Sequence, residues 1–183
     1  MTNDRTILIT GVTGNQGGAV AEALQGIGFH LRGLTRTPDS RRAAALARQG
    51  IDVVKGDLDD EATLRQALAG AWGVFGVQNA AEVGVEREEA QGKRLATLAR
   101  ESGVEHYVYT SVGSADKRTG VPHFDSKWRI EETVRGLRFP SHVILRPVFF
   151  MENLVAPYSL QGSNLASALG PGTHTRHGTY AMI

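Results

Sequence analysis

The chain has 183 residues, of which 41% are hydrophobic and 21% charged, as in an ordinary globular protein with one main core. Its formal net charge of +1 gives no general attraction to nucleic acid or to an anionic membrane, and the absence of cysteine excludes disulfide bonds, thiolate catalysis and cysteine-ligated zinc. No apolar run reaches the roughly 20 residues of a membrane helix and the first residues lack a signal-peptide layout, so we expect a cytoplasmic protein without membrane association.

Apolar strand-like segments alternate with helical patterns over the first 146 residues. The strands are predicted at residues 6–10, 30–35, 51–55, 72–77, 106–110 and 141–146. The helices between them are predicted at residues 19–27, 40–49, 60–68, 86–102 and 125–137. Repeated strand–helix–strand units with short connections predict a parallel sheet that is covered by helices on both faces. On these helices we expect Arg42, Glu131 and Glu132 to be solvated.

A glycine-rich segment, GVTGNQGG at residues 11–18, lies between the first predicted strand and the first predicted helix. In this context Gly11 permits a tight turn, Gly14 allows the backbone to approach a pyrophosphate, and Gly17 allows close packing of the helix on the strand. Backbone N–H groups and the positive end of the helix dipole then face the anion. The segment predicts a dinucleotide phosphate site, and the alternative is a tight strand-to-helix turn without a ligand.

Residues at the ends of the next strands bear on the choice of dinucleotide. NAD sites usually place an acid at the end of the second strand, but here no acid occurs before Asp39. Arg36 stands instead where a guanidinium can bind a 2′-phosphate, so we expect NADP(H) rather than NAD(H). Asp57 after the third strand can accept from adenine or cap the next helix, and Gln78 and Asn79 follow the fourth strand on the ligand-binding edge.

Several motifs between residues 6 and 154 together resemble the NmrA-like family, an atypical branch of the short-chain dehydrogenase/reductase superfamily. They are GVTGNQG at 11–17, LTR at 34–36, GDLDD at 56–60, QGK at 91–93, HFDSK at 123–127 and RPVFFMENL at 146–154. The resemblance implies a Rossmann fold that binds NADP(H) and a smaller C-terminal lobe over the nicotinamide. Members of the family include redox sensors, transcriptional co-regulators without chemistry, and NAD(P)H-dependent reductases of quinones or similar carbonyls.

The resemblance also implies roles for single residues. The backbone of residues 11–17 would bind the pyrophosphate, Arg36 the 2′-phosphate, and Asp57 with Leu58 would frame the adenine. Lys127 is similar to the lysine that binds the nicotinamide ribose, and other residues would lie near the nicotinamide half. With Gln78 added, the cofactor-binding residues expected are Gly11, Thr13, Gly14, Asn15, Gln16, Gly17, Arg36, Asp57, Leu58, Gln78, Asn79, Lys93, Lys127, Phe150 and Asn153.

One departure from the superfamily concerns the catalytic tyrosine. Ordinary members use Tyr-x-x-x-Lys, in which the lysine helps the tyrosine to act as an acid. The position four residues before Lys127 is His123, and neither Tyr107 nor Tyr109 has a lysine four residues later. Ser111 follows the fifth strand near the place of the superfamily's catalytic serine. His123 can donate a proton near neutral pH or can be a plain loop residue, so Lys127 and His123 are the catalytic candidates.

We therefore predict a doubly wound α/β Rossmann fold with sheet order 3-2-1-4-5-6. Residues 1–154 form its NADP(H)-binding domain, and residues 155–183 the start of a small C-terminal lobe that is truncated or an irregular tail that ends naturally. A cofactor sensor or regulator is the function expected from the missing tyrosine, with a quinone or carbonyl reductase as the alternative. The expected partners are the dinucleotide and a regulatory protein or small acceptor, with an oligomer possible and no metal or nucleic acid.

Overall fold

The computed structural model describes residues 4–148. The described residues up to Arg146 form one compact unit. The predicted domain boundary at 154 and the predicted cofactor-binding residues Phe150 and Asn153 lie outside the described residues. The elements in chain order are β1 Thr6–Ile9, α1 Asn15–Leu24, β2 His30–Thr35, α2 Arg41–Arg48, β3 Asp52–Lys55, α3 Glu61–Leu68, β4 Ala71–Gly76, α4 Ala80–Val83, α5 Val85–Glu101, β5 His106–Thr110, the 3-10 helix η1 Ala115–Lys117, α6 Pro122–Gly136 and β6 Ser141–Leu145.

The six described strands form one sheet in the order β3-β2-β1-β4-β5-β6, and each neighbouring pair is parallel. Ile7 of β1 lies opposite Leu31 of β2 on one side and Gly73 of β4 on the other. The predicted doubly wound fold and its strand order are confirmed. Because all these strands run the same way, the segments that follow them meet along one edge of the sheet.

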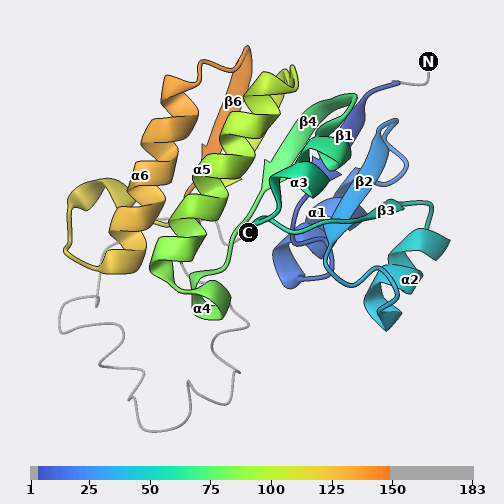
Figure 1. Cartoon of the computed structure of the whole chain (residues 1–183), viewed down its shortest axis with the longest axis horizontal. Helices are drawn as coiled ribbons and strands as arrows, with labels where there is room; N and C mark the ends of the chain where they lie inside the picture. Colours follow the sequence, from blue (N-terminus) through green and yellow to red (C-terminus); the bar gives the residue numbers. More distant parts are fainter. Residues whose placement is uncertain (1–3, 149–183) are drawn as a thin grey trace, which may run out of the picture. The chain divides into compact units, whose positions relative to one another are not determined.

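Helices cover both faces of the sheet, and each face has its own core. Helices α3, α5 and α6 lie over one face (Figure 1), where Leu8, Tyr107 and Ile130 belong to the larger apolar cluster. Ile9 and Phe75 point to the other face and pack with Ala21 of α1. Successive residues of β1 thus contribute to opposite cores, as expected for strands that are buried on both sides.

The observed helices differ from the predicted ones mainly near the glycine segment. Helix α1 begins at Asn15, four residues before the predicted start, because its first turn is polar and glycine-rich and shows no apolar period. Helix α4 and the short η1 were not predicted, since elements of three or four residues leave almost no periodic signal. Within the described part of the chain, no helix is both long and apolar enough to cross a membrane.

Candidate functional site

The glycine segment makes the tight turn that its sequence predicts. Gly11 has a φ of +60°, a conformation that favours glycine, and its carbonyl accepts a hydrogen bond of 2.8 Å from the Gly14 amide. A Cβ atom at Gly17 would lie 2.3 Å from the Gly11 carbonyl oxygen, and one at Gly14 would lie 3.2 Å from it. The first turn of α1 therefore rests directly against the end of β1, an approach that a side chain at Gly17 would block.

The N-terminus of α1 is an open set of backbone donors. Its N-cap residue, Gly14, supplies no side-chain hydrogen bond, and its first turn has no acidic residue. The amides of Asn15, Gln16 and Gly17 have no acceptor among the residues that the structure describes. An anion placed here would meet three free N–H groups and the positive end of the helix dipole.

A hollow of about 240 Å³ lies beside this turn, between the glycine segment and α2. Arg42 lines it and donates a hydrogen bond of 2.9 Å from Nη1 to the Thr13 carbonyl. The sequence suggested only a solvated arginine, because the helical period of α2 cannot show that the loop after β1 passes beside it. Arg42 thus places a positive charge next to the free amides of α1.

Arg36 follows β2 as expected, but its guanidinium is already engaged. Its Nη2 forms an ion pair with Glu82 of α4, and both side chains are about half exposed. The hydrogen bond and the charge of Glu82 raise the pKa of Arg36, so the guanidinium is charged throughout the physiological range. A 2′-phosphate at Arg36 would have to replace this carboxylate.

The segment after β3 separates the two roles considered for Asp57. The N-cap of α3 is Asp60, whose Oδ1 accepts from the amides of Ala62 and Thr63, so the capping role for Asp57 is wrong. Asp57 instead accepts from the amide of Asp59 at 3.0 Å, which closes a local turn. The adenine contact of Asp57 and Leu58 stays a prediction.

Helix α5 holds this segment in place through three long side chains. Arg87 and Gln91 bind Asp59 Oδ2 at 2.6 and 2.8 Å, and Arg94 donates to the Leu58 carbonyl at 2.7 Å. Burial alone would raise the pKa of Asp59, but the hydrogen bonds from Arg87 and Gln91 outweigh it and lower that pKa. The predicted adenine end is thereby attached to α5.

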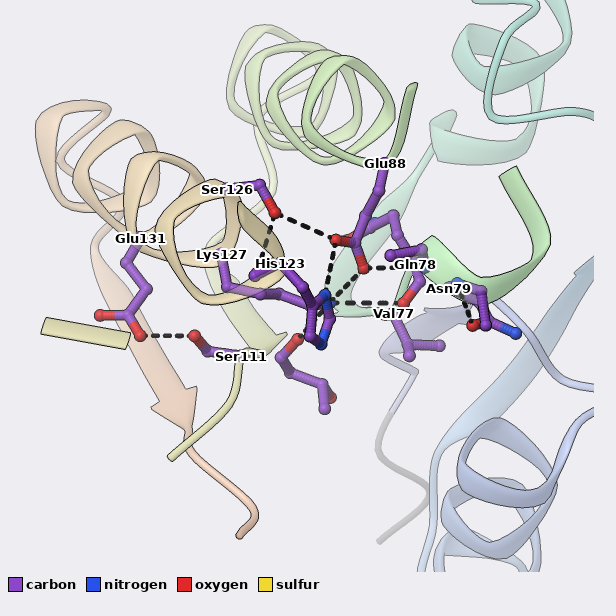
Figure 2. A network of polar contacts seen from close by, with 12 residues as sticks. Val77, Gln78, Asn79, Glu88, Ser111, His123, Ser126, Lys127 and Glu131 are labelled. Atoms are coloured by element: carbon purple, nitrogen blue, oxygen red, sulfur yellow. Dashed lines mark hydrogen bonds and ion pairs between the residues drawn. The ribbon is translucent and has the colours of Figure 1, made fainter. Parts of the chain in front are cut away.

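A buried polar cluster occupies the ends of β4 and β5 (Figure 2). The Lys127 ammonium lies 2.9 Å from Glu88 Oε1 and 3.3 Å from the carbonyl oxygens of Gln78 and Thr110. Burial lowers the pKa of Lys127, and the charge and hydrogen bond of Glu88 oppose that effect. The cluster therefore brings together two predicted residues, Lys127 and Gln78, with a carboxylate that the sequence did not single out.

His123 and Ser126 surround the same carboxylate from α6. The Ser126 hydroxyl lies 2.9 Å from the His123 carbonyl and 3.3 Å from Glu88 Oε2, and its single hydrogen is shared between these two acceptors. The His123 ring is partly exposed, and its Nδ1 lies 3.4 Å from Glu88 Oε2, within ion-pair range but without hydrogen-bond geometry. His123 is therefore linked to Lys127 through Glu88 rather than by direct contact.

Polar atoms in this cluster remain without partners. The side-chain amide of Gln78 and the hydroxyl of Thr110 are buried and have no hydrogen-bond partner among the described residues. Buried polar groups in folded proteins are nearly always paired, so these atoms are suited to a polar ligand at the strand ends. Asn79 instead caps the short helix α4, where its Oδ1 accepts from the Ala81 amide.

The two tyrosines of β5 are not placed as a general acid. Tyr107 and Tyr109 are fully buried, and their hydroxyls have no partner in the described part of the chain. Burial raises the pKa of both, and at Tyr109 the charge of Glu88 adds to the effect. Lys127 lies over the Tyr109 ring at 5.5 Å rather than beside its hydroxyl. Among the described residues, the tyrosine–lysine pair of ordinary short-chain dehydrogenases is therefore absent.

The expectation that Glu131 is solvated is wrong, although Glu132 is exposed as predicted. Glu131 is buried and accepts hydrogen bonds from the guanidinium groups of Arg135 and Arg146. It also accepts from the Ser111 hydroxyl at 2.5 Å, so this serine points away from Lys127 (Figure 2). The spacing within α6 could not show this, because Arg146 arrives from the end of β6.

Gly92 lies where α5 packs on α6, and the side chain of the next residue, Lys93, is partly exposed. Lys93 forms an ion pair of 2.7 Å with Glu89, which also binds Arg129 of α6. A Cβ atom at Gly92 would lie 2.6 Å from Ile130 Cδ1, so helix packing explains this mid-helix glycine. These contacts do not point to a ligand at Lys93, so its place near the nicotinamide stays a prediction.

Comparison with known proteins shows the family of the chain. Residues 3–172 match the NmrA-like family. The NmrA-like family domain-containing oxidoreductase himF of Aspergillus japonicus is 33% identical over 160 residues, covering 82% of this chain and 48% of the relative. The chain therefore spans about half the length of the relatives it matches.

Solved structures of two functional kinds resemble the chain. One is the Escherichia coli NADPH-dependent quinone oxidoreductase QOR2 with NADPH, at 30% identity and a TM-score of 0.71, covering 81% of this chain and 51% of the other. The negative transcriptional regulator NmrA with NADP follows at 26% identity and a TM-score of 0.67, covering 77% and 45%, and the same regulator has been solved with NAD. The family match over most of the chain, together with the Rossmann sheet and its glycine turn, shows that this chain belongs to the NmrA-like family.

Proposed function

We propose that the chain binds NADP(H) along the carboxyl edge of its sheet. The observation that carries the proposal is the N-terminus of α1, where three backbone amides are free and Gly17 allows the helix to rest on the end of β1. This is the donor set that a pyrophosphate requires, and it costs no side-chain rearrangement. The NADP complexes of QOR2 and of the regulator NmrA support the same ligand.

The remaining predicted residues fit the two ends of that ligand. Arg36 would receive the 2′-phosphate, and Asp57 with Leu58 would border the adenine. At the other end, Lys127 would bind the nicotinamide ribose, where its two 3.3 Å carbonyl contacts are the ones that a hydroxyl can replace. When bound, the nicotinamide supplies hydride chemistry, and the chain's own residues bind and orient it.

We further propose that nucleotide binding serves a sensor or regulatory role. Among the described residues no tyrosine hydroxyl reaches Lys127, and Ser111 is occupied by Glu131. His123 stands at the sequence position of the usual acid of short-chain dehydrogenases; it is partly exposed, and its Nδ1 lies 3.4 Å from Glu88 Oε2. The similarity to the negative transcriptional regulator NmrA supports this role.

A reductase is the second candidate, because QOR2 and the fungal relative himF are oxidoreductases. Direct hydride transfer to a quinone needs no tyrosine, so the missing acid does not oppose it. In this case Lys127 would orient the nicotinamide ribose and His123 would supply the proton from solvent.

A binding titration followed by a turnover assay separates these functions. We expect tryptophan fluorescence of the chain to report saturable binding of NADPH that is tighter than that of NADH. The complex is then mixed with a panel of quinones and aldehydes while the nicotinamide absorbance is followed. Tight binding without turnover supports the sensor, and steady turnover that Lys127→Met abolishes supports the reductase. Absence of binding to either nucleotide contradicts both.

A further inference from the structure

Glu88 is the most enclosed charged group of the strand-end cluster, and its side chain has no exposed surface. Its Oε1 is 2.9 Å from the Lys127 ammonium and accepts from the Ala80 amide at 3.1 Å. Its Oε2 accepts from Ser126 and lies 3.4 Å from His123. One carboxylate of α5 therefore contacts side chains of α6 (Figure 2) and also the first residue of α4.

Burial makes each charge of this pair dependent on the other. Moving an ammonium or a carboxylate out of water costs several kcal/mol, and a close opposite charge is what offsets that cost. Lys127 has no other carboxylate within 4 Å among the described residues, since its further contacts are the carbonyls of Gln78 and Thr110. A carbonyl accepts a hydrogen bond but does not neutralise a charge. Glu88 is therefore the group that offsets the free-energy cost of burying the charged Lys127.

We propose that Glu88 is a positioning residue of the nucleotide site, which holds Lys127 charged and in place at the strand ends and fixes the segment that carries Gln78 and Asn79. This role deepens the proposed function and rests on it. Because Glu88 occupies only one of the three acceptor positions around Lys127, the longer carbonyl contacts remain available for exchange with a ribose hydroxyl. The Ala80 contact lies one residue after Asn79, so the same carboxylate limits the movement of that segment.

The groups around Lys127 determine how its protonation should change when Glu88 is removed. Glu88 faces it from α5, the Tyr109 ring from β5, and His123 from α6 through Glu88. The segment that follows β4 contributes the uncharged Gln78 carbonyl. Burial lowers the pKa of Lys127 and only Glu88 opposes this effect. Without that charge Lys127 should lose its proton at a lower pH, and a neutral amine forms weaker hydrogen bonds than an ammonium.

The chain has only four lysines, which allows a direct measurement by NMR. Lysine labelled with ¹³C at Cε reports its protonation in the full chain without nucleotide, and Lys127→Met assigns the signal. In Glu88→Gln the titration midpoint of Lys127 should fall by about 1–3 pH units, the usual effect of one close opposite charge. Glu89→Gln, a matched change at the next position whose partners are Lys93 and Arg129, should leave it unchanged.

Binding of NADPH gives the second readout. Glu88→Gln should weaken it about tenfold, as should Lys127→Met, and the double variant should be no weaker than Lys127→Met alone because both changes act through one group. Should Glu88→Gln fail to fold, the double variant, which buries no unpaired charge, should fold and be tested in its place.

Three results would overturn the positioning role: an unchanged Lys127 titration in Glu88→Gln, additive losses of affinity in the double variant, or a double variant that also fails to fold. If the wild-type chain binds no NADPH, the proposed function fails instead. The Lys127 titration needs no nucleotide, so it still decides whether Glu88 controls the charge of Lys127.

Discussion

Replacing Gly17 by alanine tests the closest contact of the glycine segment. The new Cβ atom would lie 2.3 Å from the Gly11 carbonyl oxygen and 2.7 Å from that of Thr10, whereas ordinary contacts begin near 3.4 Å. Both obstacles are backbone, so the first turn of α1 has to move away from β1 by about 1 Å because neither atom can rotate aside. Such overpacking costs about 1–3 kcal/mol of stability. The same movement displaces the free amides, so NADPH should bind at least about tenfold more weakly, a loss of roughly 1.4 kcal/mol.

Gly18→Ala is the matched control, because it lies one position later on the same helix. Its Cβ atom would meet only the Val12 carbonyl oxygen at 3.4 Å, an ordinary contact. The exchange of glycine for alanine in a helix then favours the variant by up to about 1 kcal/mol. Urea unfolding followed by tryptophan fluorescence and an NADPH titration measure both effects. Equal stability and equal affinity of Gly17→Ala and Gly18→Ala would refute the role assigned to this close approach.

Three further predictions concern other parts of the molecule. Arg36→Glu should weaken NADP binding far more than NAD binding in parallel titrations, while Arg41→Glu on α2 should affect neither; equal losses for both nucleotides at Arg36 would remove the reason to prefer NADP. Burial alone would raise the pKa of Glu131, but the hydrogen bonds from Arg146, Ser111 and Arg135 outweigh it and lower that pKa in the folded chain. The stabilisation by Glu131 is therefore complete above the unfolded pKa of about 4.3 and is lost as the pH falls through the folded value. Glu131→Gln should therefore cost about 1.5–3 kcal/mol at pH 7 in urea unfolding, the usual value of hydrogen bonds to a charged group. The variant should also lose less stability than wild type on acidification, and a parallel acid profile would contradict this. Gly92→Ala should destabilise the chain by about 1 kcal/mol in the same assay. Ile130→Val should restore part of the loss, because it removes the Cδ1 atom that would lie 2.6 Å from the new Cβ atom. A Gly92→Ala variant as stable as wild type would show that α5 and α6 separate at no cost.

The fold could be predicted because strand and helix periods are local properties of the sequence. Every predicted strand lies within one residue of an observed one, since β-branched runs that end in glycine or proline leave little freedom. The start of α1 was missed because residues 15–18 are polar or glycine, so the helix there is held by its position on β1 rather than by an apolar face. An apolar period shows which side chains a helix buries, whereas the first turn of α1 packs on β1 through its backbone.

The site could be predicted only where a short motif carries the chemistry. The glycine turn follows from its place between a strand and a helix, whereas the role of Lys127 was expected only from the resemblance to the NmrA-like family, and its contact with the Gln78 carbonyl is a finding of the structure. Glu88 and Glu131 could not be recognised, because a glutamate on a polar helix is usually solvated and each owes its burial to cations from other elements. Arg42 is exposed as predicted, but its contact with the Thr13 carbonyl, 29 residues away, could not be seen in the helical period of α2.

The contact between Arg36 and Glu82 has a consequence for ionic strength. A free guanidinium gains a new ion pair when it binds a phosphate, and added salt weakens that gain by screening. Here the phosphate takes the place of the Glu82 carboxylate as the partner of Arg36. Salt therefore weakens the ion pair of the free protein as well as that of the complex, and the two effects partly cancel. Preference for the phosphorylated nucleotide should then change little between dilute and concentrated salt. Glu82→Gln should restore a steeper dependence while tightening the complex at low salt by up to about fivefold, the most that an exposed pair is worth.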